Sequence, residues 1–94
     1  MKVVINNCYG GFSLSEAGIA RYLELADLKA TSDFYDRDIP RNDDALVQVV
    51  EEMGNDANGA FAKLKIVKIP DDVEWQIDEY DGNEWIAESH RTWR

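Results

Sequence analysis

The chain has 94 residues, enough for a single small domain spanning 1–94 but too few for one subunit to enclose a deep active site, so we expect a homo-oligomer. It carries 19 acidic and 10 basic residues, and its net charge of −9 argues against a general role in coating nucleic acid or an anionic membrane. One cysteine cannot form an internal disulfide, and the apolar run at residues 3–5 is too short for a signal peptide or a membrane span, so we expect a cytoplasmic protein.

The first predicted elements are a strand and a helix joined by a double glycine. A short β-branched strand begins at residue 2, and Gly10 and Gly11 follow it with backbone that can adopt positive φ. Ser13, with Glu16 three positions later, matches the capping box that opens a helix. The helix is predicted over residues 14–28, where apolar side chains recur at i, i+3, i+4 and i+7: Ile19, Tyr22, Leu23 and Ala26.

The middle of the chain predicts an edge strand and a second helix. Residues 33–39 mix aromatic and charged side chains and end at Pro40, which is typical of a short edge strand. Asn42 or Asp43 can cap the next helix, and Gly54 can end it. The apolar stripe of this helix again occupies i, i+3, i+4 and i+7: Leu46, Val49, Val50 and Met53.

The C-terminal part predicts a loop, a strand and a hairpin. Residues 55–62 indicate a loop or an irregular helical turn, and residues 64–69 alternate as a strand that Pro70 ends. Strands at 73–79 and 83–88 flank a turn at 80–82. The order strand, helix, strand, helix, strand, hairpin predicts an α/β or α+β fold, with two helices packed on one small sheet and a C-terminal β-hairpin.

Two registers fit the hairpin. A two-residue Asp-Gly turn places Glu79 opposite Glu84, whereas a three-residue turn places Ile77 opposite Trp85. The three-residue turn is favoured because it collects apolar side chains on one face of the sheet. That face, expected to lie in the core, holds Trp75, Ile77, Trp85 and Ala87. The wetter face then holds Gln76, Asp78, Glu84 and Ile86.

The glycine junction at residues 9–15 is the predicted ligand-binding site. Glycines permit close approach to the backbone, and unpaired amides at a helix start attract phosphate. Aromatic rings can stack on a base while hydroxyl and guanidinium groups bind phosphate. The predicted ligand-binding residues are Tyr9, Gly10, Gly11, Phe12, Ser13, Ser15, Arg41, His90 and Arg91. In the competing interpretation the glycines only shape a turn, the aromatic rings pack, and the C-terminal bases pair with the protein's own carboxylates.

No catalytic residue, metal or cofactor is predicted. Cys8 and His90 can be imagined as a nucleophile pair, but their sequence separation specifies no geometry, and a small buried filler is the favoured interpretation of Cys8. The acidic run between Asp36 and Asp44 lacks the glycine and terminal glutamate of a calcium loop. A single histidine supplies too few ligands for a zinc site.

Stretches near both ends of the chain resemble one protein family. They are Val-Ile-Asn-Asn-Cys-Tyr-Gly-Gly-Phe-Ser-Leu-Ser at 4–15 and Tyr-Asp-Gly-Asn-Glu-Trp-Ile-Ala-Glu-Ser-His-Arg-Thr-Trp at 80–93. Ile-Pro-Arg-Asn-Asp at 39–43 and Ile-Pro-Asp-Asp-Val at 69–73 are also similar, so the resemblance covers most of the chain. The family is a largely uncharacterised one of small proteins met mainly in bacteriophage and prophage genomes. The resemblance implies a phage protein in the host cytoplasm and brings no established activity.

These observations predict a non-enzymatic binding protein. Small phage proteins often counter host defence, so the leading hypothesis is an anti-defence protein that sequesters a small phosphorylated, nucleotide-type signal at the glycine junction. The first alternative is an acidic protein–protein inhibitor of a host factor, in keeping with the net charge of −9. The second alternative is a small phosphoester hydrolase that uses Cys8 or His90.

Overall fold

The computed structural model describes residues 1–27 and 35–89, which form an α+β fold. The helices are α1 (Glu16–Ala26) and α2 (Asp44–Met53), with short 3₁₀ turns η1 (Asp36–Asp38) and η2 (Gly54–Ala57). The strands are β1 (Lys2–Asn6), β2 (Leu64–Lys68), β3 (Glu74–Tyr80) and β4 (Asn83–Ser89). The predicted fold class and the C-terminal hairpin are confirmed.

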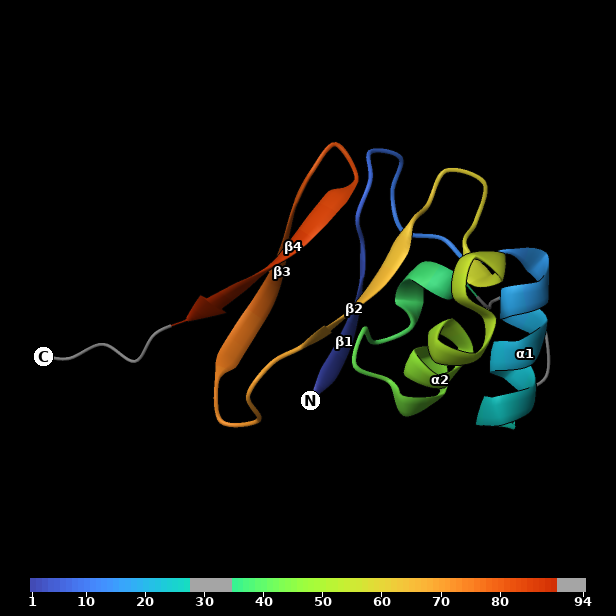
Figure 1. The fold of residues 1–94 in the computed structure, drawn as a ribbon, viewed down its shortest axis with the longest axis horizontal. Coiled ribbons are helices and arrows are strands. Elements are labelled where there is room, and N and C mark those ends of the chain that lie inside the picture. Colours follow the sequence, from blue (N-terminus) through green and yellow to red (C-terminus); the bar gives the residue numbers. More distant parts are fainter. Residues whose placement is uncertain (28–34, 90–94) are drawn as a thin grey trace, which may run out of the picture.

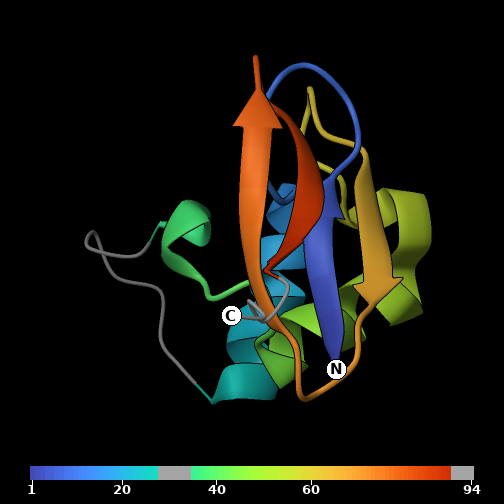
Figure 2. The ribbon, with the colours of Figure 1, turned by 90° about the vertical axis from the view of Figure 1, so that its left-hand side faces the viewer.

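The described strands form two antiparallel pairs, β1–β2 and β3–β4, where one sheet was expected. Figure 1 shows the helices on one side of β1–β2 and the hairpin on the other. Strand β4 lies next to β1, as Figure 2 shows from the hairpin side. No hydrogen-bonded strand ladder forms between β1 and β4. Contacts that involve side chains join the two pairs at this seam instead.

The larger core lies between the helices and one face of β1–β2. Val4 from β1 packs there with the apolar stripes of both helices. The buried members of those stripes are Tyr22, Leu23, Leu46, Val49 and Val50, as their helical spacing predicted. Leu64 and Ile66 of β2 complete this layer. The alternation of side chains along a strand sends their neighbours to the opposite face.

A smaller core lies between the other face of β1–β2 and the hairpin. Val3, Ile5 and Ile69 are buried there. Val67 and three hairpin side chains pack against them: Trp75, Ile77 and Ile86. The hairpin therefore packs on the rest of the protein through few apolar side chains. Its polar contacts consequently contribute more to holding it in place.

Both helix caps are local, but the first lies two residues later than predicted. Ser15, not Ser13, caps α1, and its hydroxyl oxygen accepts a hydrogen bond from the Gly18 amide at 3.0 Å. Asp43 caps α2 by accepting from the amides of Ala45 and Leu46. Gly54 ends α2 with a φ of 57°, as expected for a C-terminal glycine.

The predicted edge strand at residues 33–39 is wrong for its described part. Asp36–Asp38 form the 3₁₀ turn η1, and residues 33 and 34 lie outside the described residues. The carboxylate of Asp36 accepts a hydrogen bond from the Leu14 amide at 2.9 Å. This bond ties η1 to the segment before α1.

The three-residue hairpin register is also wrong. Tyr80 pairs with Asn83 across a two-residue turn, so Glu79 lies opposite Glu84 and Trp75 opposite Glu88. Asp81 and Gly82 both have positive φ, 54° and 90°, which matches the turn that best suits the strand twist.

This register reverses the expected faces of β4. Glu84 and Ile86 face the smaller core, while Trp85 is 45% exposed on the outer face. A shift of one residue moves every side chain of a strand to the other face.

Candidate functional site

Three loops meet at one end of the molecule, the upper end in Figures 1 and 2. They are residues 7–13 after β1, residues 58–63 before β2, and the hairpin turn at 79–83. We call this end the tip. Close contacts at glycines hold the loops together: a Cβ at Gly10 would overlap Phe61, and a Cβ at Gly82 would overlap the backbone of Gly10 and Gly11. Glycine at these positions is therefore required by packing as well as by conformation.

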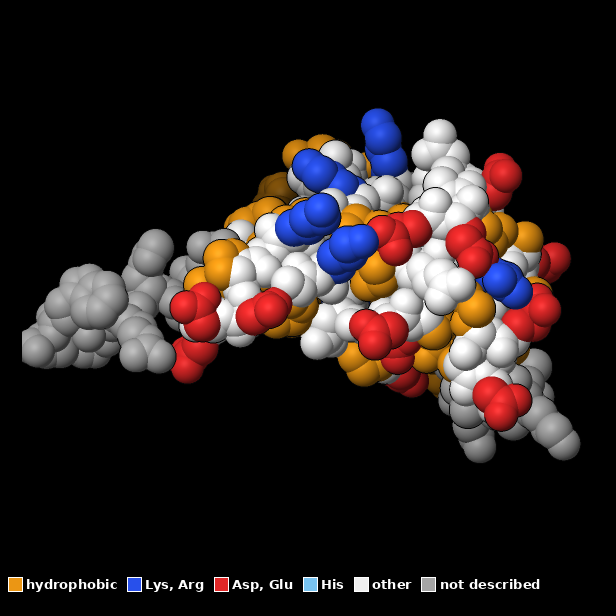
Figure 3. Space-filling view, turned by 60° about the horizontal axis from the view of Figure 1, so that its bottom comes forward, with side chains coloured by type: hydrophobic (Ala, Val, Ile, Leu, Met, Phe, Trp, Pro, Cys, Tyr) orange, Lys and Arg blue, Asp and Glu red, His pale blue; other side chains and the backbone are white. Residues whose placement is uncertain are grey.

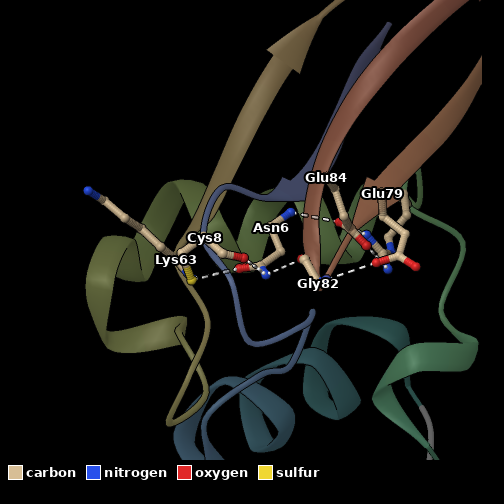
Figure 4. A network of polar contacts seen from close by, with 7 residues as sticks. Asn6, Cys8, Lys63, Glu79, Gly82 and Glu84 are labelled. Carbon is tan, nitrogen blue, oxygen red and sulfur yellow. Dashed lines mark hydrogen bonds and ion pairs between the residues drawn. The ribbon is translucent and has the colours of Figure 1, made fainter.

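Asn6, which is fully buried, ties the three loops to one another. Its amide nitrogen donates to the carbonyls of Cys8 and Gly82 at 2.8 and 2.7 Å. Its amide oxygen accepts from the Lys63 backbone N–H at 2.8 Å. Figure 4 shows this side chain at the centre of the polar network. Because a buried amide without partners is costly, Asn6 fixes the relative positions of the loops.

Glu84 and Arg41 form a second anchor between the hairpin and the body of the protein. Their side chains make two hydrogen bonds of 2.5 and 2.9 Å and are only 9% and 17% exposed. The same carboxylate accepts a hydrogen bond from the backbone N–H of Asn6 at 2.7 Å. The Arg41 guanidinium also stacks on the Phe12 ring, 3.8 Å from its centroid.

This anchor closes the outer edge of β1. The Asn7 amide donates to the Lys63 carbonyl, so alternation along an antiparallel pair turns the amides of Val4 and Asn6 away from β2. The Val4 amide donates to the Arg41 carbonyl at 2.8 Å, and the Asn6 amide donates to Glu84. Each of these outward amides thus has a partner from the Arg41–Glu84 pair, which leaves this part of the edge unavailable for another strand.

An open hollow of about 530 Å³ lies at the tip between two of the loops. Its lining consists of Tyr9, Gly10, Gly11, Glu79, Asp81 and Gly82. The charged side chains in this lining are the carboxylates of Glu79 and Asp81, both on exposed residues. One carboxylate oxygen of Glu79 accepts a hydrogen bond from the backbone N–H of Gly82 at 2.9 Å. The hollow therefore offers negative charge to whatever enters it.

Three large aromatic side chains are exposed at the tip, one on each loop. Tyr9 is 65% exposed, Phe61 76% and Tyr80 70%. The sequence singled out Tyr9 but missed Phe61 and Tyr80. The available signal was their position near glycines, Phe61 two residues after Gly59 and Tyr80 at the start of the Asp81-Gly82 turn.

The structure separates the predicted ligand-binding residues into groups. Tyr9, Gly10 and Gly11 line the hollow, and the predicted positive φ of both glycines is confirmed at 140° and 92°. Phe12 and Arg41 are engaged with each other. The Ser13 carbonyl accepts a hydrogen bond from the backbone N–H of Gly59. The Ser15 hydroxyl donates to the Asp56 carbonyl at 2.6 Å. Two predicted residues lie outside the described residues: His90 and Arg91.

Three backbone amides around the helix start already have partners within the protein. Those of Leu14, Ser15 and Gly18 donate to Asp36, Ala57 and the Ser15 hydroxyl, respectively. The position that an anion would take at Leu14 is held by the protein's own carboxylate. Phosphate binding at the junction stays a prediction, and these contacts give it less support than the sequence did.

Cys8 is a free thiol within the tip. Its sulfur donates toward the Phe61 carbonyl at 3.2 Å and lies 3.5 Å from the Asn6 amide oxygen. These contacts place Cys8 in the loop packing, but the residue is only partly buried, whereas a small buried filler was expected. The Cys8–His90 pair cannot be described, since His90 lies outside the described residues.

The clearest pKa shifts among the described residues belong to the helices. Hydrogen bonds from Arg21 and Gln48, in that order, lower the pKa of Glu52 to about 2, and the same pairing with Glu52 raises the pKa of Arg21. Burial, followed by the charge of Asp43, raises the pKa of Tyr22. These groups stabilise the helix pair and lie outside the hollow's lining.

Within residues 1–27 and 35–89, no group of three or more His, Cys, Asp and Glu side chains is placed to hold a metal ion. The described helices include none long and apolar enough to cross a bilayer. No family model matches the chain, and neither curated proteins nor solved structures gave a significant match. The resemblance to phage proteins stays a prediction.

Proposed function

We propose that the protein is a non-enzymatic binding protein that uses the tip to bind another protein with basic side chains at its contact surface. The observation that carries this proposal is the exposure of Tyr9, Phe61 and Tyr80 together at one end of the molecule. Aromatic residues supply much of the binding energy in protein interfaces when they are presented rigidly. The buried Asn6 and the glycine contacts supply that rigidity here, which reduces the entropy lost on binding.

Charge supports a basic partner. The chain has a net charge of −9, and the hollow beside the aromatic side chains is lined by two carboxylates. Figure 3 brings the opposite end of the molecule forward, where acidic side chains are spread widely and most of the basic ones gather in one patch between the upper edge and the middle of the view. A basic partner would therefore be attracted at long range by the whole protein and oriented by the carboxylates at the tip.

The nucleotide-sequestration hypothesis is the rival. The positive φ of Gly10 and Gly11 supports it. The pairing of Arg41 with Glu84 and the acidic residues that line the hollow count against it. For a phage-encoded chain the partner would be a host protein in the cytoplasm, and the proposal then becomes inhibition of a host factor. Self-association is a separate prediction, which sedimentation velocity measures directly.

The test compares three forms of the full chain as bait. They are the wild type, a tip variant carrying Tyr9→Ser, Phe61→Ser and Tyr80→Ser, and a control carrying Trp85→Ser on the outer face of the hairpin. We expect a protein retained by wild type and control but lost with the tip variant, and calorimetry with that purified protein should show salt-sensitive binding. Circular dichroism checks that each variant is folded.

Equal affinity of the purified partner for the wild type and the tip variant would overturn the proposal. So would a nucleotide that raises the melting temperature, combined with no protein whose binding depends on the tip. In that case the phosphorylated-ligand hypothesis takes its place.

A further inference from the structure

The lining of the hollow at the tip is rich in glycine. Three of its six lining residues are glycines, so much of its surface is bare backbone. Gly82 lies so close to Gly10 and Gly11 that a side chain at Gly82 has no room. The other three lining residues are Tyr9, Glu79 and Asp81. The hollow thus combines one aromatic residue with two acidic ones.

The charges of these carboxylates are not balanced by neighbours within the described part of the chain. The ion pairs found there join other groups, and neither Glu79 nor Asp81 takes part in one. By contrast, the nearby Glu84 is neutralised by Arg41 and is buried. The hairpin turn therefore carries one carboxylate that serves the fold and two that face solvent at the hollow.

We propose that this hollow receives the guanidinium group of one arginine side chain from the protein partner. The inference rests on the proposed function and names its anchoring contact. A guanidinium is planar, can stack on the Tyr9 ring, and can donate to two carboxylates at once. It is also more weakly hydrated than an ammonium group, so it loses less on entering a hollow between loops.

Arg41 and Phe12 show this recognition chemistry within the same protein. The Arg41 guanidinium lies 3.8 Å from the Phe12 ring centroid while it donates to the Glu84 carboxylate. An incoming arginine would meet the same combination of ring and carboxylate at Tyr9, Glu79 and Asp81. The internal pair is buried, whereas the hollow is open and its carboxylates are exposed.

The experiment uses the full chain labelled with ¹⁵N and follows the amide signals of Gly10, Gly11 and Gly82 by NMR. The probe is N-acetyl-arginine amide, and N-acetyl-citrulline amide is its neutral isostere. We expect saturable shifts of these three signals with the arginine probe and none with the citrulline probe. Added salt should weaken the response, because the carboxylates are exposed.

Matched variants assign the contact. Glu79→Gln and Asp81→Asn keep the size of each side chain, and Asn tolerates the positive φ of residue 81. Each should weaken the arginine probe about two- to fivefold, as expected for an exposed ion pair. Asp72→Asn, exposed in the loop before β3, changes the net charge equally and should leave the affinity unchanged.

The inference is overturned if citrulline shifts the same signals, if N-acetyl-lysine amide binds as well as the arginine probe, or if Glu79→Gln and Asp81→Asn have no effect. Its failure can be told apart from failure of the proposed function. A partner that binds the Glu79→Gln, Asp81→Asn double variant normally but not the aromatic tip variant leaves the proposed function standing. A partner that binds both variants normally overturns the inference and the proposed function alike.

Discussion

Arg41, in the loop before α2, and Glu84, in the last strand, meet in a two-bonded ion pair across 43 positions of sequence. Glu84 lies opposite Glu79 in the hairpin, an arrangement that like charges disfavour. The pairing resolves this conflict because the Arg41 guanidinium neutralises Glu84, while the Glu79 carboxylate accepts the Gly82 amide at the turn. The ion pair thus stabilises the hairpin register as well as the seam between β4 and β1.

Breaking this pair from one side should be costly. Glu84→Gln leaves Arg41 without its ionic partner, and we expect a loss of about 3 kcal/mol in the free energy of unfolding, measured by urea denaturation. The double variant Glu84→Gln, Arg41→Met should lose less free energy of unfolding than the two single variants together, because it no longer contains the unpaired charge. Strict additivity of the two changes would show that the side chains do not interact in solution.

Asn6 and Asn7 offer a matched pair for the buried amide. Asn6→Asp replaces a nitrogen that donates to two carbonyls with an oxygen, so we expect a loss of at least about 3 kcal/mol at pH 7. Asn7→Asp, at an exposed position, should cost far less.

The pH dependence gives this prediction a second readout. A carboxylate facing carbonyl oxygens has a raised pKa, so the damage from Asn6→Asp should grow as the pH rises and ionises the side chain. Equal stability of the two variants in thermal denaturation at pH 7 would contradict the role given to Asn6.

The two hairpin tryptophans should differ in their contribution to stability. Trp75 packs against the smaller core, whereas Trp85 is 45% exposed. Trp85→Ala should cost about 1 kcal/mol or less, and Trp75→Ala about 3 kcal/mol, in chemical denaturation. The reverse order would restore the three-residue turn that the sequence favoured.

Glu52 should titrate far below an ordinary glutamate. Its carboxylate accepts from Arg21 and Gln48, and its pKa is lowered from 4.5 to about 2. Because the folded pKa is the lower one, the pairing stabilises the native state fully above pH 4.5 and is lost as the pH falls toward 2. Carboxyl NMR titration measures this directly, and Arg21→Ala should return the midpoint toward 4.5. A midpoint that does not respond to Arg21→Ala would show that the pair does not form in solution.

Part of the candidate site was predictable from sequence. Tyr9, Gly10 and Gly11 were assigned to a site, and all three line the hollow. Arg41 was expected to help bind a phosphorylated ligand, whereas in the structure its guanidinium pairs with Glu84 of the same chain. The sequence could not show this, because the choice between an external ligand and an internal carboxylate depends on which side chains the fold brings within hydrogen-bond distance.

Local sequence was enough to predict the two amphipathic helices, a cap at Asn42 or Asp43, the end of α2 at Gly54 and the positive φ of Gly10 and Gly11. These features depend on residues within about one helical turn of one another, so local spacing encodes them. Tertiary structure alone decided the hairpin register, the burial of Glu84 and the assembly of the tip. Each of those depends on partners from distant segments: Arg41 for Glu84, and Gly82 and Lys63 for Asn6. Apolar alternation favoured the other register because it counts side-chain burial but not the ion pair and hydrogen bonds that make a buried carboxylate stable.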